Sequence, residues 1–371
     1  MSGGPASIPG LIWLEFRALT WSGPRARLAL AAALAVGIAI LLALMLRLQA
    51  VYWAGISAFV CIQASHPQSL RKGVHRIIGT LLGAAAAYLL FPLVAYDQFG
   101  TLLLLFAAGT LAILGSLVSD YSYAWLLGGI TVMMVVLGAL NDPSKTLDLA
   151  FYRSGEIILG TATALATARI LLPRAEFVPR PAPGWASLRG EHAYMLGHAM
   201  RSGIGMALVP VIWRVFELPD LSQMAVSIGA VMAVPVLTGD AVKDRQVLVD
   251  RAMQRLLGCV MGGGAGLLLL LTPLAQSFPI WLLALMAGAA IAAEFETGRY
   301  NLQNLGIQAE VGLIITMVQG WGPAVQLAPA FDRVAGMIGA MLLLMAVHFF
   351  LDPGVGRARR PSAKRMIHPF G

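Results

Sequence analysis

The stretch that decides the fold runs from residue 70 to residue 90 and reads LRKGVHRIIGTLLGAAAAYLL. Its first part is basic and its second part is an apolar run of small residues, as expected where a helix enters a membrane. Four of its residues recur in the second half of the chain at a constant offset of 179 positions, in the pattern Lys/Arg-x3-Arg-x2-Gly-x3-Gly. The four pairs are Lys72 and Arg251, Arg76 and Arg255, Gly79 and Gly258, and Gly83 and Gly262. The chain is therefore predicted to be a duplicated unit.

The spacing within this repeated motif indicates what each part does. Two basic residues four positions apart share one face of a helix. The Gly-x3-Gly pairs of the motif allow the backbone of another helix to come close, so all four glycines are predicted to pack against a neighbouring helix. Arg76 and Arg255 are expected where each helix enters the membrane from the cytoplasm. They either receive an anionic substrate there or anchor the helix through the excess of positive charge on that side.

The composition predicts a membrane protein that crosses the bilayer several times. Of the 371 residues, 58% are hydrophobic and 12% are charged, whereas soluble domains have ~45–50% and ~25%. The net charge of +8 is spread through short loops, which indicates membrane topology and argues against nucleic acid as a partner. Cys61 and Cys259 lie in apolar segments, so neither a disulfide nor a metal site is indicated. No nucleotide-binding loop or catalytic arrangement is present in a soluble context, so neither a cofactor nor an enzymatic activity is expected.

The apolar runs predict the helices. Residues 8–21 are predicted to form a short interfacial helix. Six apolar runs then follow in each half, several of them near the ~20 residues that a spanning helix needs. The runs are 28–46, 51–65, 75–92, 100–118, 122–140 and 152–172, and then 198–215, 221–237, 252–272, 278–293, 301–320 and 331–351. We therefore expect an all-α integral membrane protein with about 12 transmembrane helices, arranged as two parallel six-helix repeats.

The same runs give the expected domain boundaries. Residues 1–173 are an N-terminal six-helix membrane repeat with its interfacial helix, 174–192 a cytoplasmic linker, 193–353 a C-terminal six-helix membrane repeat and 354–371 a basic cytoplasmic tail. Each repeat has an even number of helices, so the two should share one orientation and be related by an axis along the membrane normal.

The distribution of basic residues predicts that both termini are cytoplasmic. With that topology the cytoplasmic segments hold 21 of the 26 lysines and arginines, which agrees with the excess of positive charge found inside. The remaining five are Arg47, Lys145, Arg153, Arg214 and Arg333.

Polar residues within membrane helices are costly and often functional. The fifth helix of the second half, residues 301–320, is the most polar, and Asn304 and Gln308 share a stripe on it. Glu310 lies about ten residues into this run. A carboxyl group at that depth is a candidate for proton coupling; the alternative is a protonated or paired glutamate that fixes helix packing. Glu294, Glu296 and Arg299 are interpreted as a charged cytoplasmic loop.

Several further residues are candidates for substrate binding. The second helix of each half is short, and short or broken helices at equivalent positions often mark a transport site; the alternative is a tilted, half-buried helix. Gln63 ends the first of them, and Tyr121 corresponds to Tyr300 at the same offset as the motif. The candidate set is Arg76, Arg255, Gln63, Tyr121, Tyr300, Asn304 and Gln308. Arg153 and Glu156, three residues apart, are predicted to pair on one helix face.

Residues 51–90 also resemble a known group of membrane proteins, the fusaric acid resistance / aromatic acid exporter superfamily. The matching features are a Tyr-Trp-Ala opening, a glutamine near the end of the second helix, a basic loop, and Arg-Ile-x-Gly-Thr-x-x-Gly. In this chain they are Tyr52, Trp53, Ala54, Gln63, Arg71, Lys72, Arg76, Gly79, Thr80 and Gly83.

The resemblance implies a function and a location. It implies proton-driven export of aromatic carboxylates or similar small organic anions across the bacterial inner membrane, with a periplasmic adaptor protein in Gram-negative relatives. A homo-oligomer is left open. Because the resemblance extends to plant anion channels, a passive anion channel is the first alternative, and a non-transporting membrane scaffold is the second. Glu310 favours coupled transport over a channel, and the paired Arg76 and Arg255 favour anion handling over a scaffold.

Overall fold

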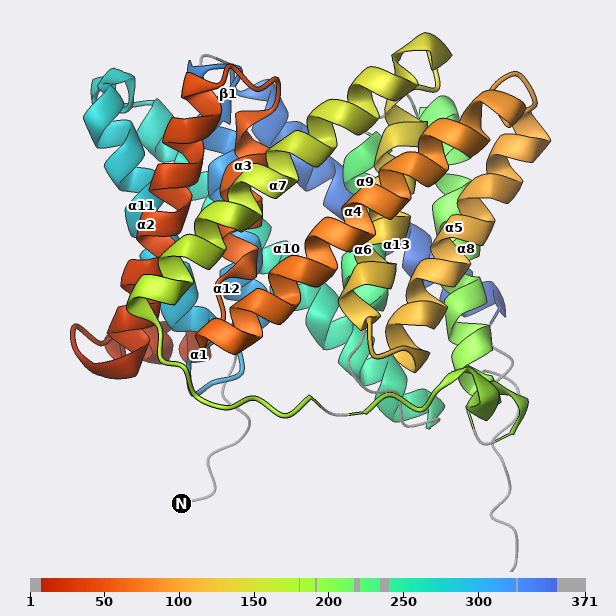
Figure 1. Ribbon diagram of the computed structural model, residues 1–371, viewed down its shortest axis with the longest axis horizontal. Helices are drawn as coiled ribbons and strands as arrows, with labels where there is room; N and C mark the ends of the chain where they lie inside the picture. The colour runs from red at the N-terminus through yellow and green to blue at the C-terminus, as the bar shows by residue number, and fades with distance from the viewer. Residues whose placement is uncertain are drawn as a thin grey trace, which may run out of the picture.

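The structure is a computed structural model that describes residues 8–179, 181–190, 192–216, 221–233, 240–324 and 326–351. The basic tail expected at 354–371 lies outside these residues. Thirteen α-helices account for most of the described chain (Figure 1). An all-helical fold is therefore confirmed, with one small addition, a hairpin of two short strands.

Helix α1 (Ile8–Arg17) is followed by six helices before the linker and six after it. The first set is α2 (Gly23–Met45), α3 (Val51–Cys61), α4 (His66–Val94), α5 (Gln98–Val118), α6 (Ser122–Gly138) and α7 (Thr146–Leu171). The second set is α8 (Ala193–Phe216), α9 (Leu221–Met232), α10 (Ala241–Leu270), α11 (Phe278–Glu296), α12 (Gln303–Met317) and α13 (Ala328–Leu351). Short 3₁₀ turns lie at Pro143–Lys145, Trp185–Arg189 and Pro273–Gln276, and strands β1 (Val318–Gln319) and β2 (Gly322–Pro323) pair antiparallel.

The motif that opens each half lies inside a helix rather than at a loop–helix junction. Helix α4 begins at His66 because Ser65 is extended at the N-cap and Pro67 occupies the first turn, where its fixed φ suits a helix. Arg71 and Lys72, expected in a basic loop, are therefore helical. The apolar run at 75–92 marks only the apolar part of α4, since the helix continues through its charged first turns.

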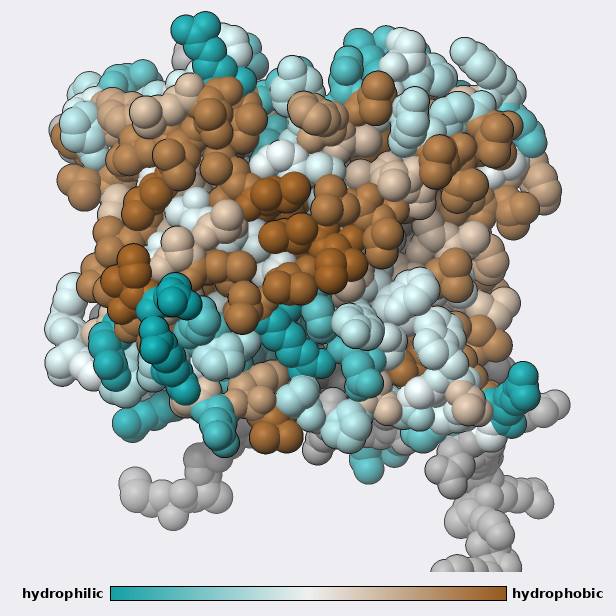
Figure 2. All heavy atoms as spheres, in the orientation of Figure 1, coloured by the Kyte–Doolittle hydropathy of each residue, from teal (hydrophilic) through white to brown (hydrophobic). Residues whose placement is uncertain are grey.

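Within the described residues, six helices are long and apolar enough to cross a membrane, by length and composition: α2, α4, α5, α8, α11 and residues Lys243–Leu270 of α10. Shorter apolar helical stretches are α3, α6 and residues Ala335–Val347 of α13. Figure 2 shows hydrophobic residues across the middle of one face and hydrophilic residues toward its lower edge and at its upper tips. The chain is therefore a multi-pass membrane protein.

The two halves of the chain are interlocked. Helix α2 packs on α11, and its counterpart α8 packs on α5, so the first helix of each half lies against the fourth helix of the other. Within each half the third helix packs on the fifth, α4 on α6 and α10 on α12. The second helix packs on the sixth, α3 on α7 and α9 on α13. The pattern of contacts in one half is thus repeated in the other.

Helices α3 and α9 are too short to cross a bilayer without the residues that flank them. They have 11 and 12 residues, or roughly 17 Å at ~1.5 Å per residue, against a hydrocarbon core of ~30 Å. Helix α3 ends at Cys61, four residues before the predicted end, because Ile62 is extended with ψ 129°. Pro235, which interrupts the apolar run at 221–237, and Gly239, which follows that run, lie outside the described residues. Both short helices are enclosed by others, α3 by α2, α7 and α12, and α9 by α8, α13 and α6.

The linker and α1 lie at one edge of the molecule, which we call the linker edge, and the hairpin β1–β2 lies at the opposite edge, which we call the hairpin edge (Figure 1). Two hydrogen bonds attach the linker. The Ala182 N–H donates to the Asp120 carboxylate at 2.9 Å, and the Gly184 N–H donates to the Val118 carbonyl at 3.0 Å.

Candidate functional site

Arg76 is buried among α3, α4 and α6. Its side chain is 4% exposed. One terminal nitrogen donates to the Tyr123 hydroxyl at 2.7 Å and the other donates to the Ser57 hydroxyl at 3.1 Å. Both partners are neutral, and no carboxylate pairs with Arg76 among the described residues. A buried guanidinium with neutral partners is a place where an anion would be favourably held.

Arg255 occupies the equivalent position on α10. It donates to the Gln308 side-chain oxygen on α12 at 3.1 Å. Tyr123 lies on α6, the counterpart of α12, so each arginine reaches from the third helix of its half to the fifth. The repeated motif therefore places two similar guanidinium groups at related positions. The structure brings Arg255 and Gln308 of the candidate set together.

Glu310 lies in the middle of α12 on a different face from Gln308. It is 1% exposed, and neither carboxylate oxygen has a hydrogen-bond partner among the described residues. The side chain faces α11, where a Cβ added to Gly288 would lie 2.7 Å from Oε2. Since Gln308 turns toward α10 and Glu310 toward α11, the proton-coupling candidate and the arginine of the same half are on opposite sides of α12.

The other polar candidates are spread along the linker half of the molecule. Asn304, one turn before Gln308, is buried at 7% exposure. The Gln63 side-chain nitrogen donates to the Ile62 carbonyl at 2.5 Å, at the end of α3. The Glu296 carboxylate lies close to the Gln63 amide and the Lys72 ammonium group. Gln63 thus sits where the end of α3 meets the end of α11 from the other half.

Tyr121 and Tyr300 lie at the starts of α6 and α12, and neither contacts an arginine of the motif. Tyr121 is 59% exposed and its ring packs 5.3 Å from the His75 ring. Tyr300 offers its backbone N–H to Glu15 at 3.2 Å. The tyrosine that bonds Arg76 is Tyr123, which sequence reasoning missed. The signal was a polar aromatic residue at the start of a span, since Tyr123 is the second residue of α6, but the sequence does not show that α6 packs on α4.

The four motif glycines lie where helix backbones touch. A Cβ on Gly79 or Gly83 would collide with the carbonyl oxygens of Ala124 or Gly128 on α6. A Cβ on Gly258 or Gly262 would collide with those of Leu305 or Ala309 on α12. Close helix contact through glycine is the geometry that Gly-x3-Gly pairs permit.

The end of α9 is held by side chains from two other helices. Arg251 on α10 donates to the carbonyls of Ala230 and Ala233 at 3.1 and 2.9 Å. A ring nitrogen of His198 on α8 lies 2.9 Å from Met232 O. Carbonyls at a helix end have no intrahelical partner, so the first basic residue of the second motif satisfies the end of this short helix.

At the start of α3 the Ala50 N–H donates to Glu156 at 2.7 Å. Glu156 also pairs with Arg153 at 3.5 Å, as the three-residue spacing predicted, and Arg153 lies 4.4 Å above the Trp53 ring. These contacts attach the start of α3 to α7.

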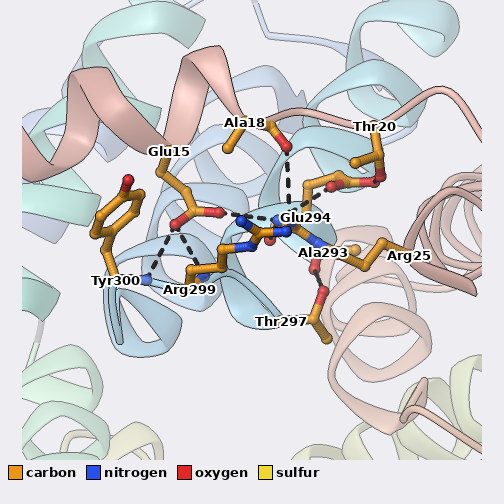
Figure 3. A network of polar contacts seen from close by, with 9 residues as sticks. All are labelled: Glu15, Ala18, Thr20, Arg25, Ala293, Glu294, Thr297, Arg299 and Tyr300. Carbon is orange, nitrogen blue, oxygen red and sulfur yellow. Dashed lines mark hydrogen bonds and ion pairs between the residues drawn. The ribbon is translucent and has the colours of Figure 1, made fainter.

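A buried ionic network ties α1 to the second half (Figure 3). Arg25 lies between Glu15 and Glu294, at 2.9 and 3.1 Å. Glu15 also accepts the backbone N–H of Arg299 at 3.1 Å. The interpretation of Glu294 as part of a charged loop is wrong: Glu294 lies inside α11, 4% exposed, because Arg25 neutralises it.

These features define an all-helical, multi-pass membrane protein with two interlocked halves, in which a buried arginine, Arg76, and a half-buried one, Arg255, occupy equivalent positions. Residues 25–177 match the fusaric acid resistance protein family. The resemblance seen at residues 51–90 is therefore confirmed for this larger region.

Relatives of known name match a short part of the chain. The p-hydroxybenzoic acid efflux pump subunit AaeB of Edwardsiella tarda (strain FL6-60) is 39% identical over 105 residues, which are 28% of this chain and 16% of that protein. The same subunit of Salmonella arizonae is 32% identical over 107 residues, with the same coverage. The chain thus matches about a sixth of the length of these relatives. No solved structure matches the chain significantly.

Proposed function

We propose that the protein is a secondary transporter of the inner membrane that exports aromatic carboxylates or similar small organic anions. The observation that carries the proposal is the buried Arg76, whose guanidinium has only neutral partners among the described residues. A carboxylate substrate would supply the missing negative charge and accept two hydrogen bonds in a planar arrangement. The efflux of p-hydroxybenzoic acid named for the relatives supports the same substrate class.

We place twelve spans in the membrane, with both termini and the linker in the cytoplasm. The basic residues support this orientation, since 21 of the 26 fall on the linker side of the predicted topology. The repeated pattern of helix contacts supports two parallel six-helix repeats. The enclosed short helices α3 and α9 would then occupy equivalent places in the two repeats, and short helices at equivalent places often mark a transport site.

We propose Glu310 as the proton-coupling group. An ionised carboxylate without a hydrogen-bond donor is strongly disfavoured in a membrane interior, so Glu310 would carry a proton in the conformation seen here. Opening of the α11–α12 interface to water would allow the proton to leave. The name "pump subunit" of the relatives supports the further proposal of a periplasmic adaptor as partner, which co-purification from membranes would test.

The function is tested by transport into inverted vesicles. Vesicles with the wild-type protein should accumulate 4-hydroxybenzoate when a proton gradient is imposed, and vesicles with Arg76→Gln should lose at least about tenfold of this rate, since a charge-assisted hydrogen bond to the anion is removed. Arg71→Gln is the matched control, because Arg71 lies on the same helix and, among the described residues, donates a solvent-exposed hydrogen bond to the Asp120 carbonyl at 2.8 Å. Equal transport by wild type and Arg76→Gln would exclude Arg76 as the anion site.

A further inference from the structure

A cavity of about 400 Å³ opens at the hairpin edge, away from the residues discussed so far. Its walls are formed by the end of α8, the start of α5, the α4–α5 connection and the segment that follows α6. It therefore lies where α5 of the first half packs on α8 of the second.

Two residues that line this cavity, Trp213 and Arg214, carry hydrogen-bond donors without a partner in the described residues. Arg214, in the last turn of α8, has no hydrogen bond or ion pair within the described part of the chain. The indole N–H of Trp213 is buried and has no acceptor there either. Tyr96, Gln98 and Asn141 add a hydroxyl and two amides around the opening.

No carboxylate lines the cavity in the described chain, and two described acidic residues next to it in sequence, Asp97 and Asp142, are engaged elsewhere. Glu217, which follows Arg214 in the sequence, lies outside the described residues. Asp97 accepts the Phe99 backbone N–H at 3.0 Å and caps α5. Asp142 accepts the Ser144 hydroxyl at 2.5 Å and pairs with Lys145 at 3.3 Å. Within the described ranges, Arg214 thus has no carboxylate partner.

The position of Arg214 has a simple structural explanation, but that of Trp213 does not. A basic residue in the last turn of a helix interacts favourably with the helix dipole. A buried N–H group, by contrast, normally finds an acceptor. Leu102, Leu140 and Val211 add apolar side chains to the lining. The cavity therefore combines a cation and an unsatisfied donor with apolar wall residues.

We propose that this cavity binds an organic anion with an apolar body, whose charged group is held by Arg214 and the indole N–H of Trp213. Two sources supply such a molecule: a soluble aromatic acid at the hairpin face, or an anionic phospholipid of the adjacent leaflet. The proposed export function enters only in the choice of the aromatic acid as a probe.

The test measures ligand binding through Trp213, a residue that lines this cavity. Purified full-length protein containing 5-fluorotryptophan is placed in phosphatidylcholine nanodiscs, and the ¹⁹F resonance of Trp213 is identified by its loss in Trp213→Phe. Titration with 4-hydroxybenzoate, or a series of nanodiscs with increasing phosphatidylglycerol, should shift this resonance. Whichever probe shifts it identifies the source.

Two variants decide whether Arg214 holds the anion. Arg214→Gln should raise the probe concentration at half-shift by about tenfold or more, as expected for loss of a charge-assisted hydrogen bond. Arg47→Gln, which changes another exposed arginine of the same edge, should leave the titration unchanged. The resonances of the other tryptophans report that both variants remain folded.

The proposal is overturned if neither probe shifts the Trp213 resonance, or if Arg214→Gln and wild type titrate alike. Failure of the export function would appear separately, as absence of transport in vesicles while the Trp213 titration persists.

Discussion

Arg76 and Glu310 are both buried, but their hydrogen bonding differs. The Arg76 guanidinium donates to two neutral hydroxyl groups, so it could still bind an anion. Glu310 has no donor among the described residues, so its charged form has nothing to stabilise it. The two residues lie in different halves of the chain, and the first half has no acid at the position that matches Glu310. The chemistry of the repeats is therefore asymmetric although their packing is not.

Glu310→Gln tests the role of the buried carboxyl group. Glutamine keeps the shape and cannot release a proton, so the variant should lose gradient-driven accumulation while exchange of labelled for unlabelled 4-hydroxybenzoate continues. Its melting temperature should match or exceed that of the wild type, because no paired charge is removed. Both quantities can be measured on one preparation, by vesicle flux and by thermal denaturation in detergent. Full proton-driven accumulation by Glu310→Gln would leave the acid a packing role and favour a passive anion channel.

At the scale of helices, the closest contacts are α4 with α6 and α10 with α12. Each contact is made by two glycines of the motif against backbone carbonyls of the partner helix. A side chain there would force the helices apart over several turns, because the obstructing atoms are backbone and cannot rotate away.

Gly262→Leu should therefore lower the yield of folded protein severalfold, and Gly264→Leu should not. The two glycines lie in the same apolar run of α10, but a Cβ on Gly262 would meet the Ala309 carbonyl, whereas a Cβ on Gly264 would meet nothing within 4 Å. Folded yield is measured by size-exclusion chromatography in detergent. Equal yields for the two variants would show that close contact at Gly262 is dispensable.

Helix α1 is attached to α11 through Arg25, which pairs with Glu15 on α1 and Glu294 on α11. Arg25→Gln leaves Glu15 and Glu294 buried without their cation, and breaking such a pair destabilises proteins by roughly 3–5 kcal/mol. We expect a clear drop in melting temperature, partly restored in the double variant Glu15→Gln/Arg25→Gln. Arg27→Gln is the control, since Arg27 is exposed and has no ion pair among the described residues. An unchanged melting temperature for Arg25→Gln would mean that the network contributes little.

For the whole molecule, the prediction concerns orientation. A cytoplasmic reporter inserted after Trp185 in the linker should be active, and a periplasmic reporter inserted at Gly320 in the β1–β2 turn should be active as well. The structure places these two sites at opposite edges, and the basic residues favour the linker edge as cytoplasmic. Activity of the periplasmic reporter in the linker would reverse the proposed topology.

The sequence predicted the positions of the helices better than it predicted which helices pack against each other. Long apolar runs are a local property, so α2, α5 and α11 could be predicted closely. The burial of Glu15 could not, since α1 shows it opposite an apolar stripe and its partners Arg25 and Arg299 lie on other elements. The same holds for Arg76, which was predicted at an entrance: its neighbours Ser57 and Tyr123 come from helices whose pairing no periodicity reveals.

The exchange of α2 and α8 between the halves also has a consequence for synthesis. When α2 leaves the ribosome, its main partner from the other half, α11, has not been translated, and α11 begins only at Phe278. At ~5–20 residues per second, α2 waits on the order of tens of seconds in the bilayer before its packing surface is covered. During this time the packing surface of α2 in the nascent first half is accessible to a chaperone, an insertase or a protease. Separate expression of the two halves should yield stable protein only when both are made in the same cell.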